Sequence, residues 1–149
     1  MAAGATWFAV CLMVAAAWQD CRSYRIANVL CLGIGFLAAV HAFAIDAIRT
    51  LPWLTAALLL VAGVLLWRAG VMGAGDVKLV CACSLWFPER PEDFILLTAC
   101  FGGAVALSLL VWARLRGRSA PAVPYGVAIG SAGMLNPAVF ANAASMMPG

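Results

Sequence analysis

Two aspartates stand out as candidate catalytic groups. Asp76 lies in the run Gly73-Ala74-Gly75-Asp76-Val77-Lys78, within a chain that is otherwise almost continuously apolar. An ionised Asp at the centre of a bilayer costs about 2.5–3.5 kcal/mol, so such residues usually have a partner or a function. Glycines at 73 and 75 remove side chains from around this carboxylate and let another backbone approach it. Asp20, at the end of the first apolar segment, is the one other carboxylate placed to share such a site.

Two carboxylates close together in a site of low dielectric tend to hold one proton between them. Such a pair supplies a base that activates water and an acid that protonates a leaving amine. Peptide hydrolysis by this chemistry requires neither a metal nor a cofactor, and we expect none. A simpler interpretation remains open, in which Asp20 is a solvated helix end and Asp76 is the N-cap of a helix that begins at Val77.

Composition indicates a membrane protein. Of the 149 residues 66% are hydrophobic and 10% are charged, whereas soluble domains carry about 25% charged residues. The length suits one membrane-embedded domain over residues 1–149, with lipid around it. The net charge of +3 is too small and scattered to indicate a nucleic-acid partner. Six cysteines form no CxxC pair, which favours buried thiols that act as small hydrophobes.

Apolar segments predict an all-α, polytopic membrane protein with about six transmembrane helices. A membrane-spanning helix needs about 20 apolar residues, with a usual range of roughly 17–25. The fourth segment is too short to span alone, which predicts a half-helix or a loop that dips into the bilayer. The six segments cover residues 4–19, 27–45, 52–67, 77–87, 94–112 and 122–141.

Basic residues indicate the orientation of these segments. If the connecting loops alternate between the two sides, seven of the nine basic residues fall on one side, which the positive-inside rule identifies as cytoplasmic. Both chain termini are then expected outside, with Asp20 and Asp76 at the cytoplasmic face. The seven residues are Arg22, Arg25, Arg68, Lys78, Arg114, Arg116 and Arg118.

Three motifs in this chain resemble those of the type IV prepilin peptidases, which are membrane aspartic proteases of the Gly-x-Gly-Asp class. Asp20-Cys21-Arg22, followed by Ile26-Ala27-Asn28, is similar to the motif of the first aspartate. Gly73-Ala74-Gly75-Asp76-Val77-Lys78 is similar to the motif of the second, and Pro124-Tyr125-Gly126 to the segment that opens the last helix. The resemblance extends over essentially the whole chain.

This resemblance implies an aspartic endopeptidase that removes the leader peptide of type IV prepilin-like substrates at the cytoplasmic face of the bacterial inner membrane. Asp20 and Asp76 are then the catalytic residues. The prepilin or pseudopilin substrate is the implied partner. The other motif residues are implied to position the substrate or the site: Arg22, Asn28, Gly73, Gly75, Lys78, Pro124, Tyr125 and Gly126.

Two departures from the family pattern are visible. Ala27 stands where the first motif usually has proline, which affects the geometry of the loop before the second helix. The cytoplasmic domain with paired CxxC motifs, found in larger members that also N-methylate their product, has no counterpart here. The chain therefore resembles the small, peptidase-only form associated with tight-adherence (Flp) pili, and we expect cleavage without methylation.

Other interpretations remain open at this stage. Asp20 and Asp76 are also compatible with a proton relay in a small proton-coupled transporter, although no inverted repeat relates residues 1–70 to 71–149. A non-catalytic assembly subunit of a pilus or secretion system is a third hypothesis. Lys78 has three candidate roles: to hold the charge of Asp76, to orient substrate, or to reach the membrane interface. The identity of the pilin and the oligomeric state do not follow from the sequence.

Overall fold

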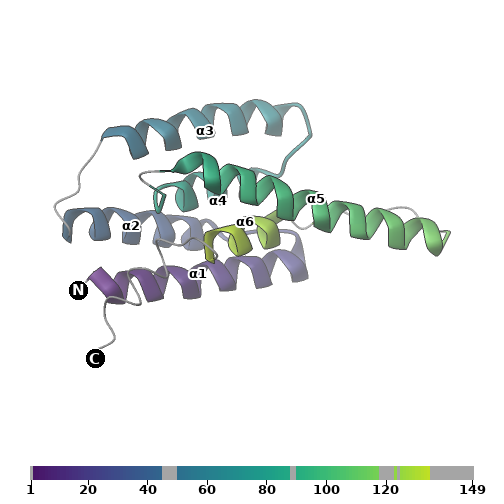
Figure 1. The fold of residues 1–149 in the computed structure, drawn as a ribbon, viewed down its shortest axis with the longest axis horizontal. Coiled ribbons are helices and arrows are strands. Elements are labelled where there is room, and N and C mark those ends of the chain that lie inside the picture. Colours follow the sequence, from purple (N-terminus) through teal and green to yellow (C-terminus); the bar gives the residue numbers. More distant parts are fainter. Residues whose placement is uncertain (1, 45–49, 88–89, 118–122, 124, 135–149) are drawn as a thin grey trace.

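The computed structural model describes residues 2–44, 50–87, 90–117, 123 and 125–134. Within them lie six helices and no strand, which confirms the all-α prediction for this part of the chain. Successive helices run in alternating directions, so the α1–α2 and α3–α4 connections lie at the same end (Figure 1). The helices are α1 (Ala2–Ser23), α2 (Asn28–Ala44), α3 (Thr50–Arg68), α4 (Ala74–Ser84), α5 (Pro91–Leu115) and α6 (Tyr125–Met134).

The start of α4 differs from the sequence-based expectation. The helix begins at Ala74 rather than Val77, and its N-cap is Gly73, with φ −71° and ψ 144° and no side-chain cap. The N–H of Val77 donates to the Gly73 carbonyl oxygen (3.2 Å), so the glycine-rich run forms the first helical turn. The interpretation of Asp76 as the N-cap is therefore wrong, because Asp76 is the third residue of the helix. Neither Gly73 nor Gly75 has a positive φ.

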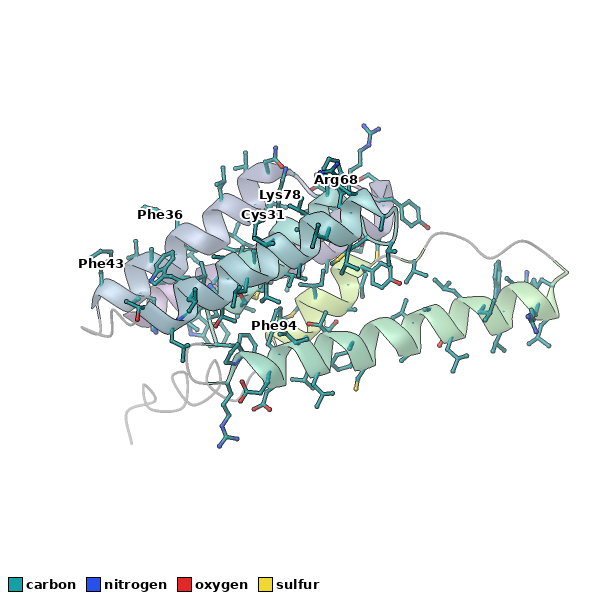
Figure 2. The ribbon with its side chains drawn as sticks, turned by 90° about the horizontal axis from the view of Figure 1, so that it is seen from above. Cys31, Phe36, Phe43, Arg68, Lys78 and Phe94 are labelled. Atoms are coloured by element: carbon teal, nitrogen blue, oxygen red, sulfur yellow. The ribbon has the colours of Figure 1, made fainter. Side chains whose placement is uncertain are left out.

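The two shortest helices link the bundle together. Helix α4 packs against α2, α3 and α6, while α6 packs against α1, α4 and α5. In Figure 2, α6 lies between α5 and the remaining helices. Glycines bring α6 close to α1: a Cβ at Gly130 would lie 3.2 Å from the Ala17 Cβ and from the Met13 carbonyl oxygen. Close backbone approach through small residues is common between membrane helices.

Helices α3 and α5 are the two in the described residues that are long and apolar enough to cross a membrane. Only 6% of the most apolar stretch of α3 and 11% of that of α5 are buried. The core helix of a soluble protein would instead be mostly buried, and exposed apolar surface of this extent indicates contact with lipid or protein. Helix α2 is apolar but shorter, and α4, with 11 residues, rises only about 16 Å. The six-span count thus stays a prediction.

Candidate active site

Asp20 lies in the last turn of α1 and is buried, with 4% of its surface exposed. Its Oδ2 accepts a hydrogen bond from the backbone N–H of Gly126 (2.8 Å). Gly126 is the second residue of α6, and the first N–H groups of a helix have no partner within the helix. The positive end of the α6 dipole also favours a negative charge at this position. The Asp20 carboxylate therefore caps the N-terminus of α6. The same hydrogen bond fixes the position of the carboxylate.

Asp76 lies in the first turn of α4 and is half-buried. Its carboxylate is turned back towards the start of its own helix, because a Cβ at Gly73 would lie 2.8 Å from Asp76 Oδ2. A side chain at position 73 would have to displace the carboxylate. Gly73 thus leaves room for the Asp76 carboxylate in this orientation, and it does not adopt an unusual backbone conformation.

The two carboxylates lie within electrostatic reach of each other. Asp20 and Asp76 lie outside the predicted membrane-spanning segments, and neither belongs to α3 or α5. Burial raises the pKa of Asp20, and the hydrogen bond from Gly126 opposes this shift. Burial, followed by the charge of Asp20, raises the pKa of Asp76 to about 6, against a backbone hydrogen bond from Gly73. The structure therefore brings together the two aspartates that the sequence analysis selected, from helices α1 and α4.

Such a pair favours a state with one proton. Ionising the second carboxyl places two negative charges in a partly desolvated site, and the proton is retained until higher pH. The Gly126 N–H and the start of α6 favour the ionised form of Asp20. The charge on Asp20 in turn raises the pKa of Asp76 and so favours the protonated form of Asp76. The arrangement can provide a base at Asp20 and an acid at Asp76.

The α1–α2 loop packs directly against the start of α4. A Cβ at Gly75 would lie 3.3 Å from the Ile26 Cβ and 3.4 Å from the Ile26 backbone nitrogen. Three residues further along α4, Lys78 Nζ donates a hydrogen bond to Asn28 Oδ1 (2.9 Å), and both of these side chains are exposed. Figure 2 shows Lys78 on the side of α4 near Cys31 of α2. The backbone that Gly75 admits is thus the α1–α2 loop of the protein itself.

Comparison with protein families identifies the family of the chain. Residues 7–108, more than half of the chain, match the type IV leader peptidase family. The chain belongs to this family. Searches of curated proteins and of solved structures gave no match. The matched residues include both aspartates, while Gly126, which holds Asp20, lies beyond them.

Family membership confirms the resemblance to the prepilin peptidases noted in the sequence. It indicates that the protein is a peptidase of prepilin-type substrates, from a membrane-associated family. The two exposed apolar helices, α3 and α5, agree with a membrane location for this leader peptidase.

Three further motif residues of the leader peptidase were expected at the site. The Arg22 guanidinium stacks over the Trp18 ring, 5.0 Å from its centroid, along the exposed face of α1. The Tyr125 ring packs towards α5, where its Cδ1 and Cε1 would lie 3.5 Å from a Cβ at Gly102. No described contact joins either side chain to the aspartates. Pro124 lies outside the described residues.

The sequence analysis missed Gln19 and did not consider Ile26 separately. Gln19 Oε1 accepts a hydrogen bond from the backbone N–H of Ala27 (2.9 Å), which ties the last turn of α1 to the end of the loop. One signal was available in the sequence: Gln19 is the single glutamine of the chain and immediately precedes Asp20. Its partner is a backbone group, which no side-chain motif reveals.

Proposed function

We propose that this leader peptidase is an aspartic endopeptidase in which Asp20 and Asp76 act on one water molecule. The observation that carries the proposal is the electrostatic interaction of two carboxylates from different helices: burial first, and then the charge of Asp20, raise the pKa of Asp76 to about 6. A structural carboxylate gains nothing from a like charge beside it, since the pair destabilises the ionised form. Perturbed carboxyl groups of this kind are concentrated at functional sites.

The charge states assign a role to each aspartate. Ionised Asp20 accepts a proton from the water as its oxygen attacks the peptide carbonyl carbon, and protonated Asp76 donates its proton to the carbonyl oxygen. In the second step Asp20 donates its new proton to the leaving amine as the C–N bond breaks, and Asp76 takes a proton from one hydroxyl of the tetrahedral intermediate as the carboxylic acid product forms. One water is consumed, and the pair returns to its one-proton state. This division follows from the Gly126 N–H, which favours the negative charge on Asp20.

The proposed substrate is the leader peptide of a type IV prepilin-like protein, of the Flp type, cleaved at the cytoplasmic face. Its support is the family match together with the short α1–α2 loop, residues 24–27, which leaves no room there for an inserted domain. The whole of residues 1–149 would act as one membrane-embedded domain. Arg22, Asn28, Lys78, Pro124, Tyr125 and Gly126 would position substrate or the aspartates, together with Gly73 and Gly75.

Leader removal without methylation is the expected activity. Co-expression with a Flp-type prepilin should convert the prepilin to a shorter form on a gel. In a host with no other prepilin methyltransferase, mass spectrometry of the product should show a free N-terminal amine. A host carrying an empty vector provides the control. An N-methyl group that depends on this protein would contradict the peptidase-only assignment.

Topology provides a separate expectation for the six-span arrangement. Reporter fusions after Ala69 and Arg116 should report the cytoplasm, and fusions after Asp46 and Glu92 the outer side, because seven of the nine basic residues fall on the first side. The fusion after Glu92 is decisive, since α4 has only 11 residues. A cytoplasmic signal there would mean that α4 does not cross, and the six-span arrangement would be wrong.

A further inference from the structure

Gln19 connects the candidate catalytic helix α1 to the loop that follows it. Its Oε1 accepts the hydrogen bond from Ala27 N–H at 2.9 Å, in a part-buried position. The Ala27 carbonyl oxygen accepts a hydrogen bond from Leu30 N–H (3.0 Å), so Ala27 is also tied to the first turn of α2, which begins at the next residue. One side chain therefore fixes the end of the loop relative to the last turn of α1, one residue before Asp20.

The same loop is held from the other side by α4. Ile26, adjacent to Ala27, packs against Gly75, which precedes Asp76. Asn28, on the other side of Ala27, accepts the hydrogen bond from Lys78. A continuous path of contacts thus runs from Gln19 through residues 26–28 to the first turn of α4. Both ends of this path lie next to an aspartate.

We propose that Gln19 is a positioning residue of the peptidase, which fixes the separation of Asp20 and Asp76 by holding the α1–α2 loop against α4. This proposal rests on the proposed function, in which the two aspartates act together. It also accounts for alanine at position 27. Proline there would stiffen the loop by fixing φ but has no N–H to donate, whereas in this chain the Ala27 N–H and Gln19 provide the restraint.

The test combines substitutions at positions 19 and 27 in the full-length purified protein, with a synthetic prepilin leader peptide as substrate. Gln19→Ala should lower the cleavage rate by about fivefold to tenfold, the size expected for loss of one hydrogen bond that orients a reacting group. Ala27→Pro on its own removes the donor of the same hydrogen bond and takes it from Gln19 Oε1, so it should also lower the rate. In the Gln19→Ala background it should restore most of the rate, because proline removes the unpaired N–H and stiffens the loop. Ser108→Ala, which removes an exposed hydroxyl bonded within α5, is the matched control.

A pH profile separates positioning from a loss of folded protein. Loss of folded protein lowers every rate by the same factor and leaves the profile in place. A wider separation weakens the repulsion between Asp20 and Asp76 and lets water in, and both effects lower the pKa of Asp76 from about 6. The one-proton pair would then lose its proton at a lower pH. The alkaline limb of the rate–pH profile should therefore move to lower pH in Gln19→Ala, and move back towards its wild-type position in Gln19→Ala/Ala27→Pro.

Two results would overturn the inference. One is a Gln19→Ala variant with the wild-type rate and profile, and the other is an Ala27→Pro effect of the same size in both backgrounds. The variant Asp20→Asn, assayed alongside, distinguishes this failure from a failure of the proposed function. If Asp20→Asn is inactive while Gln19→Ala is normal, the aspartate pair stands and only the role of Gln19 is wrong.

Discussion

Replacing either aspartate by asparagine should abolish leader removal while the protein still inserts and accumulates in the membrane. Asparagine keeps the size of the side chain but cannot act as an acid or a base, so Asp20→Asn removes the proposed base and Asp76→Asn the proposed acid. The loss should reach at least about a hundredfold, since general acid–base catalysis contributes about 10²–10⁴-fold. At position 76, asparagine also removes a carboxylate whose ionised form burial disfavours, so folding should not suffer.

Glutamate at either position should fail as well. Its extra methylene displaces the carboxylate by about 1 Å or more, and a displacement of that size costs on the order of a hundredfold in rate. Asp93→Asn is the matched control, because Asp93 is an exposed carboxylate in the first turn of α5 whose pairing with Arg90 is long (3.9 Å). Such surface pairs contribute little, and that variant should cleave normally. Equal losses in Asp93→Asn and Asp20→Asn would mean that the assay reports folding and not catalysis.

Adding one methyl group at Gly126 should have the second largest effect. A Cβ there would lie 2.8 Å from the Asp20 Cβ and Oδ2 and 2.9 Å from its Cγ. Contacts below 3.0 Å with the Cβ and Cγ of Asp20 cannot be relieved by rotating its carboxylate, so α6 or Asp20 must move. The hydrogen bond from Gly126 to Asp20 would lengthen, and the carboxylate would lose its position. We expect Gly126→Ala to lose on the order of a hundredfold in cleavage rate.

Gly103→Ala provides a close comparison for Gly126→Ala. Gly103 also lies within a helix, and a Cβ at this position would meet no atom within 4 Å. Alanine is favoured over glycine in helices by about 1 kcal/mol, so this variant should fold at least as well and cleave normally. Both variants should be quantified in the membrane fraction before the assay. Normal cleavage by Gly126→Ala at a normal amount of protein would show that the contact between α6 and Asp20 is not needed.

Sequence reasoning found the helices and the aspartates for identifiable physical reasons. Long apolar runs leave few alternatives to helices in a membrane, since backbone polar groups must be satisfied internally. The alternation of these runs brings the end of α1 and the start of α4 to one end of the bundle, where Asp20 and Asp76 interact. The resemblance to a known family then pointed to peptide cleavage, and the family match supports that conclusion.

The contacts that hold the site were not predictable in the same way. Gly126 and Asp20 are separated by 106 residues, and the donor is a backbone group that every residue except proline possesses. The start of α4 was misplaced because glycines usually mark a break in a helix, whereas here Ile26 packs against Gly75 within the first turn. Lys78 had three candidate roles, and only the folded loop shows its hydrogen bond to Asn28.

The most direct test of the central claim is the cleavage rate of the purified double variant Asp20→Asn/Asp76→Asn, compared with the two single variants on the same leader peptide. If the two carboxyl groups work as one unit, either single substitution removes the whole function. The double variant should then retain about the same residual rate as each single variant, because residues that act together give non-additive losses. Wild-type cleavage by either single variant, or a double variant whose loss equals the product of the two single losses, would contradict the account.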